Sequence, residues 1–139
     1  MGIAHQRADT GRRQADADQA STAAALRVQT ALLDQLFESA PEAIVMLDME
    51  DRITRANREF QRLFGYSADE CVGRLLNDLI VPPGMMEHAM NLTHEVVGCG
   101  RQCSAESVRR RKDGSTMHVS ILGAPISSGE RQIAAYAIY

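Results

Sequence analysis

Residues 43–57 read AIVMLDMEDRITRAN, and the fold class follows from this segment. A short apolar run over 43–47 is followed by an acidic turn and by a second extended run over 52–56, which predicts a β-hairpin. Asn57 comes directly after the second run, and asparagine is a favoured N-cap residue. We therefore expect a pair of antiparallel strands that leads straight into a helix.

Several short helices are predicted between this hairpin and residue 80. The first carries an apolar stripe of Phe60, Leu63 and Phe64 at helical spacing. The sequence SADE over 67–70 is a capping box, so another helix is expected to begin there. A leucine-rich run over 75–80 predicts a further helical turn before the prolines that follow.

The longest internal helix is expected over 85–97, after a Pro-Pro-Gly break, with Met86, Met90 and Val97 on its inner stripe. Three extended segments follow, over 102–111, 116–126 and 132–139. An Asp-Gly turn separates the first two, which is a strong hairpin pattern. Hairpins at both ends with helices between them predict an α+β fold with one antiparallel sheet.

The first 39 residues precede this domain. Residues 1–22 form a polar tail, which cannot bury enough surface to order itself although its composition also favours helix. Residues 23–39 repeat apolar side chains at spacings of three, four and seven, among them Leu26, Leu33 and Phe37, which predicts an amphipathic helix. Such a helix either packs on its own domain or pairs with a second copy, and we expect a homodimer through it.

Composition narrows the classes of function. The 139 residues carry a formal net charge of −3 and are 45% hydrophobic, which indicates a folded domain and gives no reason to expect a nucleic-acid partner. The longest apolar runs, 43–47 and 133–139, fall far short of the roughly 20 residues of a membrane span. The polar first 22 residues are no secretory signal, and three cysteines fit a reducing compartment. A cytoplasmic protein without membrane contact is expected.

From about Leu33 to Tyr139 the chain resembles the PAS sensory domains of bacterial signalling proteins. The resemblance is carried by LFESAPEAIVMLDMEDRITRANREFQRLFGYSADECVGRLLNDLIVPP over 36–83 and by RRRKDGSTMHVSILGAPI over 109–126. The first segment contains the hairpin, the helix that begins at an asparagine, a Gly-Tyr-Ser step and a Gly-Arg turn. The second contains a Lys-Asp-Gly hairpin.

This resemblance implies a five-stranded antiparallel sheet in the order 2-1-5-4-3, with short helices that close a cavity over one face. It places the PAS domain at 40–139, after the tail over 1–22 and the helix over 23–39. Family members usually continue past the fifth strand into a signalling helix. The chain is therefore expected to be a piece of a larger regulator, truncated before its output region.

The resemblance also implies which residues face the cavity. In the family register Val45 and Leu47 point inward from the hairpin, while their neighbours point to the other face of the sheet. The remaining predicted lining residues are almost all apolar: Phe60, Leu63, Leu76, Leu79, Met86, His88, Met90, Val119 and Ile121. Two interpretations stay open, a filled hydrophobic core or a cavity that takes an unidentified small ligand.

Two cofactors of the family are weighed by the same resemblance. The flavin photoreceptor branch needs a reactive cysteine beside an asparagine after the Gly-Arg turn, and the run GRLLNDL over 73–79 has leucines there, which excludes a cysteinyl-flavin. The haem branch ligates iron through a histidine near the place of His88, although His88 lies one residue closer to the prolines. The arginine of that branch has no match near Ala105. Haem is thus a minor alternative, and no tightly bound cofactor is the main expectation.

Other clusters point to no chemistry. The spacing of His88, His94, Cys99 and Cys103 matches no structural zinc pattern, so no metal site is expected. The basic run over 109–112 is interpreted as the solvated end of a hairpin, because alternate members of a strand face opposite sides. No nucleophile, base and orienting group recur in a catalytic pattern, so this chain alone is not expected to be an enzyme.

The expected function is that of a PAS sensor and dimerisation module in bacterial signal transduction, for example in a two-component system. It would sense a small ligand or a partner state and relay it to an absent effector. The resemblance implies a histidine kinase or a diguanylate cyclase or phosphodiesterase as that effector. The alternative is a ligand-free interaction domain with a filled apolar core, which dimerises through Leu26, Leu33 and Phe37.

Overall fold

The computed structural model describes residues 2–139, with side chains described from residue 10 onward. The chain divides into two compact units, 1–36 and 37–139. The first unit consists of the greater part of helix α1 (Gly2–Ser39), which runs without a break through both the polar tail and the predicted amphipathic helix. Its large apolar side chains are exposed: Leu26, Val28, Leu32, Leu33 and Leu36. None of the described helices combines the length and apolar character needed to cross a lipid bilayer.

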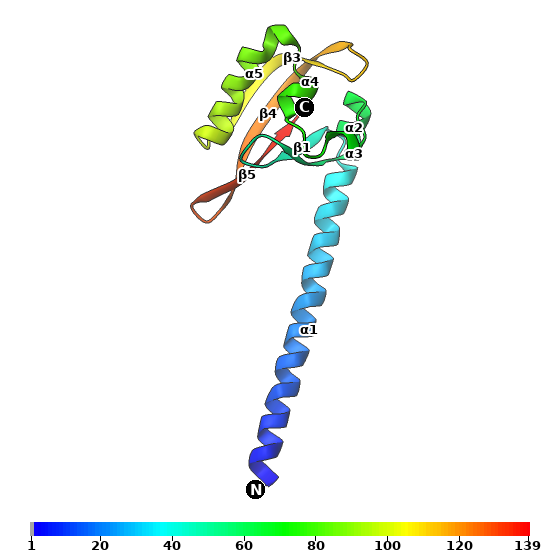
Figure 1. Cartoon of the computed structure of the whole chain (residues 1–139). Coiled ribbons are helices and arrows are strands. Elements are labelled where there is room, and N and C mark those ends of the chain that lie inside the picture. The colour runs from blue at the N-terminus through cyan, green and yellow to red at the C-terminus, as the bar shows by residue number, and fades with distance from the viewer. Residues whose placement is uncertain (1) are drawn as a thin grey trace. The chain divides into compact units, whose positions relative to one another are not determined.

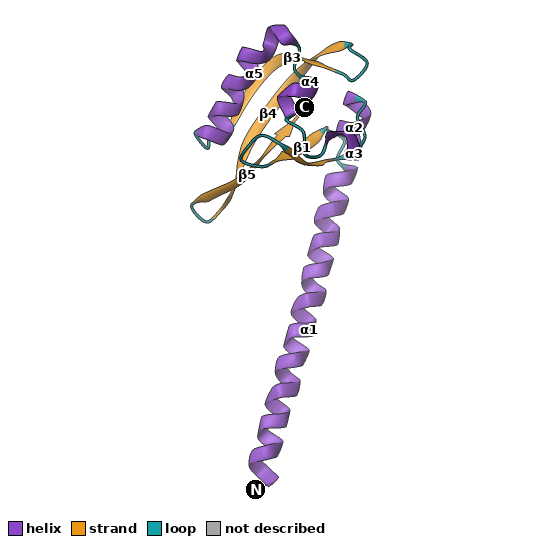
Figure 2. Cartoon of the chain, viewed as in Figure 1, coloured by secondary structure: helices purple, strands orange, loops and turns teal. Residues whose placement is uncertain are grey.

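The second unit is built on one antiparallel sheet of five strands (Figures 1 and 2). The strands are β1 (Ile44–Leu47), β2 (Ile53–Ala56), β3 (Cys103–Arg110), β4 (Thr116–Ser128) and β5 (Arg131–Ile138). Their order is β2-β1-β5-β4-β3, which confirms the predicted α+β class and the predicted order. Burial alternates along β1, with Val45 and Leu47 buried and their neighbours half-buried, as the strand period requires.

Short helices gather on one side of this sheet (Figure 1). They are α2 (Arg58–Phe64), α3 (Ala68–Cys71), α4 (Leu76–Ile80), the 3₁₀ turn η1 (Pro83–Met85), α5 (Met86–Thr93) and the π-helical turn η2 (His94–Gly98). Both predicted N-caps are confirmed: the Asn57 side chain accepts from the Phe60 amide, and Ser67 and Glu70 form a capping box. Gly65 ends α2 at φ 83°, a conformation that favours glycine.

The helix expected over 85–97 is divided into η1, α5 and η2, and of its predicted inner stripe Met86 and Val97 pack against the core, whereas Met90 does not. Ala89 and Val96 are buried, whereas the side chain of Met90 is 60% exposed. Met90 is therefore corrected from a lining residue to a surface residue. The two candidate stripes differ by about 100° around the helix, and both are apolar, so periodicity alone could not choose between them.

The core centres on three aromatic rings. Phe60 and Phe64 are fully buried on α2, with ring centroids 4.7 Å apart. Tyr139 packs on them, its ring centroid 5.3 Å from that of Phe64 in an edge-on arrangement. The Tyr139 backbone amide also donates to the Ala43 carbonyl at 2.9 Å, so the end of β5 is tied to the start of β1.

Candidate functional site

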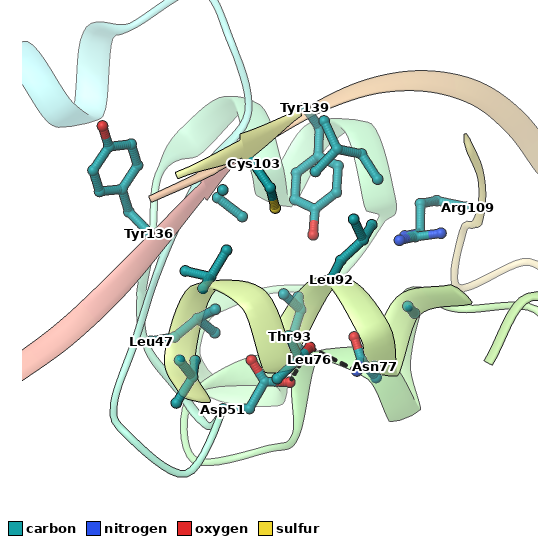
Figure 3. A pocket seen from close by; sticks show the side chains of 16 residues that line it. Leu47, Asp51, Leu76, Asn77, Leu92, Thr93, Cys103, Arg109, Tyr136 and Tyr139 are labelled. Atoms are coloured by element: carbon teal, nitrogen blue, oxygen red, sulfur yellow. Dashed lines mark hydrogen bonds between the residues drawn. The ribbon is translucent and has the colours of Figure 1, made fainter. Parts of the chain in front are cut away.

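A cavity of about 50 Å³ lies in the second unit between the sheet and helices α4 and α5 (Figure 3). Its apolar walls come from four parts of the fold, which only the tertiary structure brings together: Leu47 of β1, Leu76 of α4, Ala89, Leu92, Val96 and Val97 of α5 and η2, and Ile121, Gly123 and Ala137 of β4 and β5. The polar side chains of Asp51, Asn77, Thr93, Arg109 and Tyr139 form another part of the wall. Cys103 and Tyr136 also line it.

The predicted lining residues divide into three groups. Leu47, Leu76 and Ile121 line the cavity. Others are buried beside it without reaching its wall: Val45, Phe60, Leu79 and Val119. Leu63 is half-buried against the core, and Met86 and Met90 line a separate surface groove of about 250 Å³.

His88 does not line the cavity. Its side chain is half-buried on α5, with Nδ1 3.4 Å from the Ser107 hydroxyl. The cavity is also much smaller than the roughly 300–1,000 Å³ of ordinary ligand pockets. The cavity therefore does not fit a haem bound through His88, because His88 is not among its lining residues and its volume is too small. Nor does the volume fit a flavin, and Cys71 lies in the core outside the cavity wall.

A chain of three polar side chains crosses one wall of the cavity. The Asn77 amide donates to the Thr93 hydroxyl at 3.2 Å, and that hydroxyl donates to an Asp51 carboxylate oxygen at 3.5 Å. Burial raises the pKa of Asp51 to about 6, the Thr93 hydrogen bond opposes this, and nearby Asp48 adds to it. Asp51 also adopts φ 64° in the β1–β2 turn, a region that aspartate tolerates better than most residues. The carboxyl group is thus held in place to titrate at the cavity wall.

Arg109 is more deeply buried than Asp51, the other charged residue that lines the cavity. Only 3% of Arg109 is exposed, so the interpretation of residues 109–112 as a solvated hairpin end is wrong for this residue. Its Nη1 donates to the Ser107 hydroxyl and to the Val108 carbonyl, each at 2.9 Å. Burial lowers the pKa of its guanidinium, and the nearby Tyr139 opposes the shift. Arg110 and Arg111 are half-buried, and Arg111 Nε donates to the Leu63 carbonyl at 3.2 Å, whereas Lys112 is exposed and pairs with Glu70.

The sequence analysis did not identify Arg109 as a lining residue, although the pairing of strands β3 and β4 indicated it. The Asp-Gly turn pairs Ser107 with Val119 and Arg109 with Met117. Directly paired residues of antiparallel strands share one face, and faces alternate along a strand. Since Val119 was predicted to face inward, Ser107 and Arg109 had to do so as well. No sequence pattern predicted the Asp51–Thr93 contact, because it joins a turn to a helix 42 residues away.

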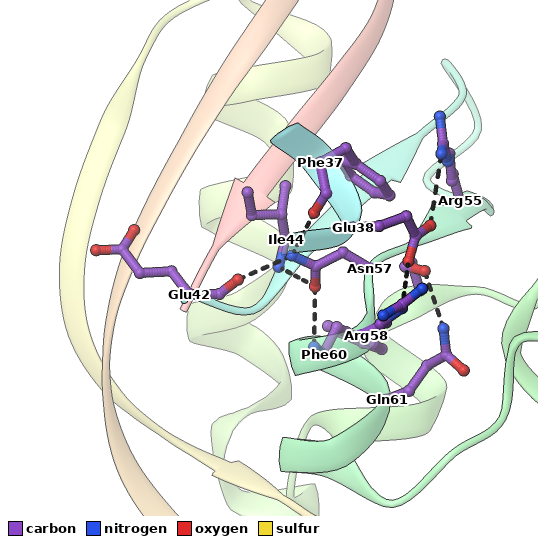
Figure 4. A network of polar contacts seen from close by, with 10 residues as sticks. Phe37, Glu38, Glu42, Ile44, Arg55, Asn57, Arg58, Phe60 and Gln61 are labelled. Carbon is purple, nitrogen blue, oxygen red and sulfur yellow. Dashed lines mark hydrogen bonds and ion pairs between the residues drawn. The ribbon is translucent and has the colours of Figure 1, made fainter. Parts of the chain in front are cut away.

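A second polar network lies at the start of the domain (Figure 4). The Asn57 amide donates to the carbonyls of Phe37 and Glu42 at 3.0 and 2.9 Å. Its oxygen accepts from the amides of Ile44 and Phe60, both at 2.9 Å. One side chain therefore joins the last turn of α1, strand β1 and helix α2.

Contacts of Arg55 reinforce this junction. Arg55 lies over the Phe37 ring, 4.4 Å from its centroid, and its Nη2 is 3.4 Å from a Glu38 carboxylate oxygen. The Phe37–Ser39 turn is thus held by both the hairpin and α2 within the second unit.

Comparison with known proteins identifies the fold family. The sequence model described as the PAS fold matches residues 31–137. The chain is 30% identical over 115 residues to the sensor protein FixL of Bradyrhizobium diazoefficiens, and 29% identical over 93 residues to the sensor histidine kinase TmoS of Ectopseudomonas mendocina. These matches cover 76% and 67% of this chain but only 22% and 10% of the relatives, so the chain spans a small part of their length.

Solved structures agree in fold. The PAS domain of a Colwellia psychrerythraea protein superposes with a TM-score of 0.70 at 26% identity, covering 81% of this chain and 93% of that one. The PAS domain of an HTR-like protein from Haloarcula marismortui gives 0.68 at 25% identity, covering 85% and 95%. The sheet order, the helices over one face and the match over residues 31–137 lead to one conclusion: the chain belongs to the PAS fold family.

Proposed function

We propose that this chain is the sensor module of a cytoplasmic bacterial signal-transduction protein and that the contents of its cavity set its state. The observation that carries the proposal is the cavity itself, which contains a buried arginine and a titratable carboxyl group instead of being filled by apolar side chains. The similarity to FixL and TmoS supports a sensory role. This module would carry no catalytic activity of its own.

The Asn57 junction supports a route from the cavity to the rest of the protein. Leu47 lines the cavity at one end of β1, and Ile44 at the other end donates to Asn57, which also holds the Phe37 carbonyl. A shift of β1 would therefore change the support of the Phe37–Ser39 turn. A ligand biases such a two-state element only by binding one state more tightly than the other. The effector that reads this bias would be a histidine kinase, as in TmoS, or a cyclic-dinucleotide enzyme.

Dimerisation through α1 is a second function, favoured by the exposed apolar residues of that helix. Leu26, Leu33 and Leu36 are each more than 60% exposed. Leu26 and Leu33 are seven residues apart, the spacing of a coiled-coil seam. If the cavity takes no ligand, the module would act as a dimerisation domain alone.

Two measurements on the purified chain separate these functions. Mass spectrometry of a denatured extract tests for a bound small molecule, and a stoichiometric molecule from the wild-type protein supports the sensor proposal. An extract without any such molecule, from cells in which the protein responds to no added compound, would contradict it and favour the dimerisation domain.

Sedimentation equilibrium tests the seam with a matched pair of variants. Leu33→Glu places a charge on the seam, whereas Ala31→Glu places the same charge about 160° away on the same exposed helix. We expect a dimer for the wild type and for Ala31→Glu, and a monomer for Leu33→Glu. Equal masses for the two variants would rule out this seam.

A further inference from the structure

Arg109 is a buried cation for which the fold supplies no anion. It forms no ion pair with any carboxylate of the described side chains, 10–139. Within that range its Nε is the buried side-chain nitrogen or oxygen that has no hydrogen-bond partner. A buried charge without pairing and a buried N–H without an acceptor both raise the free energy of the folded state. Such a group indicates that something outside the chain completes it.

The guanidinium is fixed in orientation by one edge and open on another. Nη1 donates to the Ser107 hydroxyl and to the Val108 carbonyl, so the group cannot rotate freely. Nε lies on the edge that arginine uses for two parallel hydrogen bonds to a carboxylate. The Tyr139 hydroxyl lies next to the guanidinium, and its oxygen can accept a hydrogen bond from Arg109. Burial raises the pKa of Tyr139, so its own O–H stays protonated and can donate to a ligand. Figure 3 shows both groups at the cavity beside Leu92.

The other charged group of the cavity does not neutralise Arg109. Asp51 forms no ion pair with Arg109; its carboxylate accepts instead from the Thr93 hydroxyl, which itself accepts from the Asn77 amide. The rest of the wall is aliphatic, including Leu92, Val97 and Ile121. The cavity therefore offers one anion-binding edge next to an apolar wall.

Its size limits the anion. A cavity volume of about 50 Å³ is far below the roughly 300–1,000 Å³ of pockets that take drug-sized ligands. This room suits a carboxylate group with at most a short alkyl end, and it excludes nucleotides and other large ligands. A carboxylate can form two parallel hydrogen bonds with the arginine fork, and a formate- or acetate-sized ion is smaller than a phosphate ester.

We propose that the cavity binds a small monocarboxylate, of the size of formate or acetate, with its carboxylate on the Nε edge of Arg109 and its apolar end against Leu92 and Ile121. This inference rests on the proposed sensor function and names the chemical class of its ligand. The Tyr139 hydroxyl would donate to the same carboxylate. The ligand would supply both the missing counter-charge and the missing acceptor.

The test is a titration of the whole chain with sodium acetate at pH 7, followed by amide NMR shifts. Acetamide has nearly the same shape without the charge, and sodium chloride at equal ionic strength controls for salt. We expect saturable shifts from acetate at cavity residues such as Leu92 and Gly123, and none that saturate from acetamide or chloride. Arg109→Met should weaken acetate binding at least about ten-fold, because it removes a charge-assisted pair. Arg110→Met, on the neighbouring half-buried arginine, should leave it unchanged.

Three results would overturn the proposal: no saturable shift with acetate, equal shifts with acetamide, or unchanged acetate binding in Arg109→Met. A folded Arg109→Met variant is verified by its retained amide spectrum, and Arg109→Lys provides a second variant that keeps the charge but lacks the fork. Arg109→Lys should bind acetate more weakly than the wild type. If acetate fails while a neutral molecule is extracted from the wild type, the monocarboxylate is wrong and the sensor function stands.

Discussion

Asn57 and Arg109 are two buried polar side chains of the same domain, and they differ in how completely their hydrogen-bonding groups find partners. Asn57 is fully buried, and it accepts two hydrogen bonds and donates two. Arg109 is 3% exposed, yet its Nε has no partner among the described side chains and backbone. A satisfied buried group fixes the fold, whereas an unsatisfied one leaves binding capacity unused. The contrast assigns a structural role to the Asn57 junction and a ligand role to the Arg109 end of the cavity.

The largest expected effect is that of Asn57→Ala. The change removes four hydrogen bonds and leaves the backbone groups of Phe37, Glu42, Ile44 and Phe60 without this partner, so the free energy of unfolding should fall by about 4 kcal/mol. Urea denaturation measures it. Asn77→Ala is the control, because that side chain forms a single hydrogen bond, to Thr93, and its loss should cost about 1 kcal/mol. If Asn57→Ala and Asn77→Ala lowered the free energy of unfolding equally, Asn57 would have no special role in stabilising the fold.

Arg109→Met should have a smaller effect of the opposite sign. It replaces a buried, unpaired charge by an apolar side chain of similar length, so the ligand-free protein should become more stable by about 1 kcal/mol. The measurement is again urea denaturation, in a buffer without carboxylates. A loss of more than about 2 kcal/mol would mean that Ser107 and Val108 compensate the charge, and the comparison with Asn57 would then fail.

The smallest expected effect is a change in the pH dependence of stability at Asp51. Its pKa is raised from 3.8 to about 6, so between these pH values the folded state binds more protons than the unfolded state. Stability from this group is therefore present below about pH 4 and is lost as the pH rises through 6. Asp51→Asn should remove that decline. Thermal melts from pH 4 to 7 test it, with exposed Asp78→Asn as the control that should keep the wild-type slope.

This window differs from that of the surface carboxylate Glu70. Hydrogen bonds from Lys112 and Ser67 lower the pKa of Glu70 to about 2, so its contribution is present above pH 4.5 and is lost as the pH falls towards 2. The two groups therefore affect stability in separate ranges. If the stability of Asp51→Asn still falls below pH 4, that fall is due to groups such as Glu70, and it does not contradict the prediction for Asp51.

Local features of the sequence were sufficient to predict most of the fold. The hairpin over 43–57, the cap at Asn57 and the capping box at Ser67 depend on residues a few positions apart, and all three are present in the structure. The inner face of α5 was not predictable in this way, because Met90 and Ala89 are both apolar neighbours on one helix. Which of them is buried depends on how α5 packs against the sheet.

By itself, the sequence determined the succession of strands and short helices along the chain and their caps, because these follow from periodicity and from turn chemistry. The order of the strands in the sheet and the inward direction of Val45 and Leu47 were expected from the resemblance to the PAS family. Only the tertiary structure decided what the cavity contains. Asp51, Thr93, Arg109 and Tyr139 come from a turn, from helix α5, from the edge strand β3 and from the residue after the central strand β5, and no local pattern links them. Their charge and hydrogen-bonding character in the cavity arises from burial, which is a property of the packed whole.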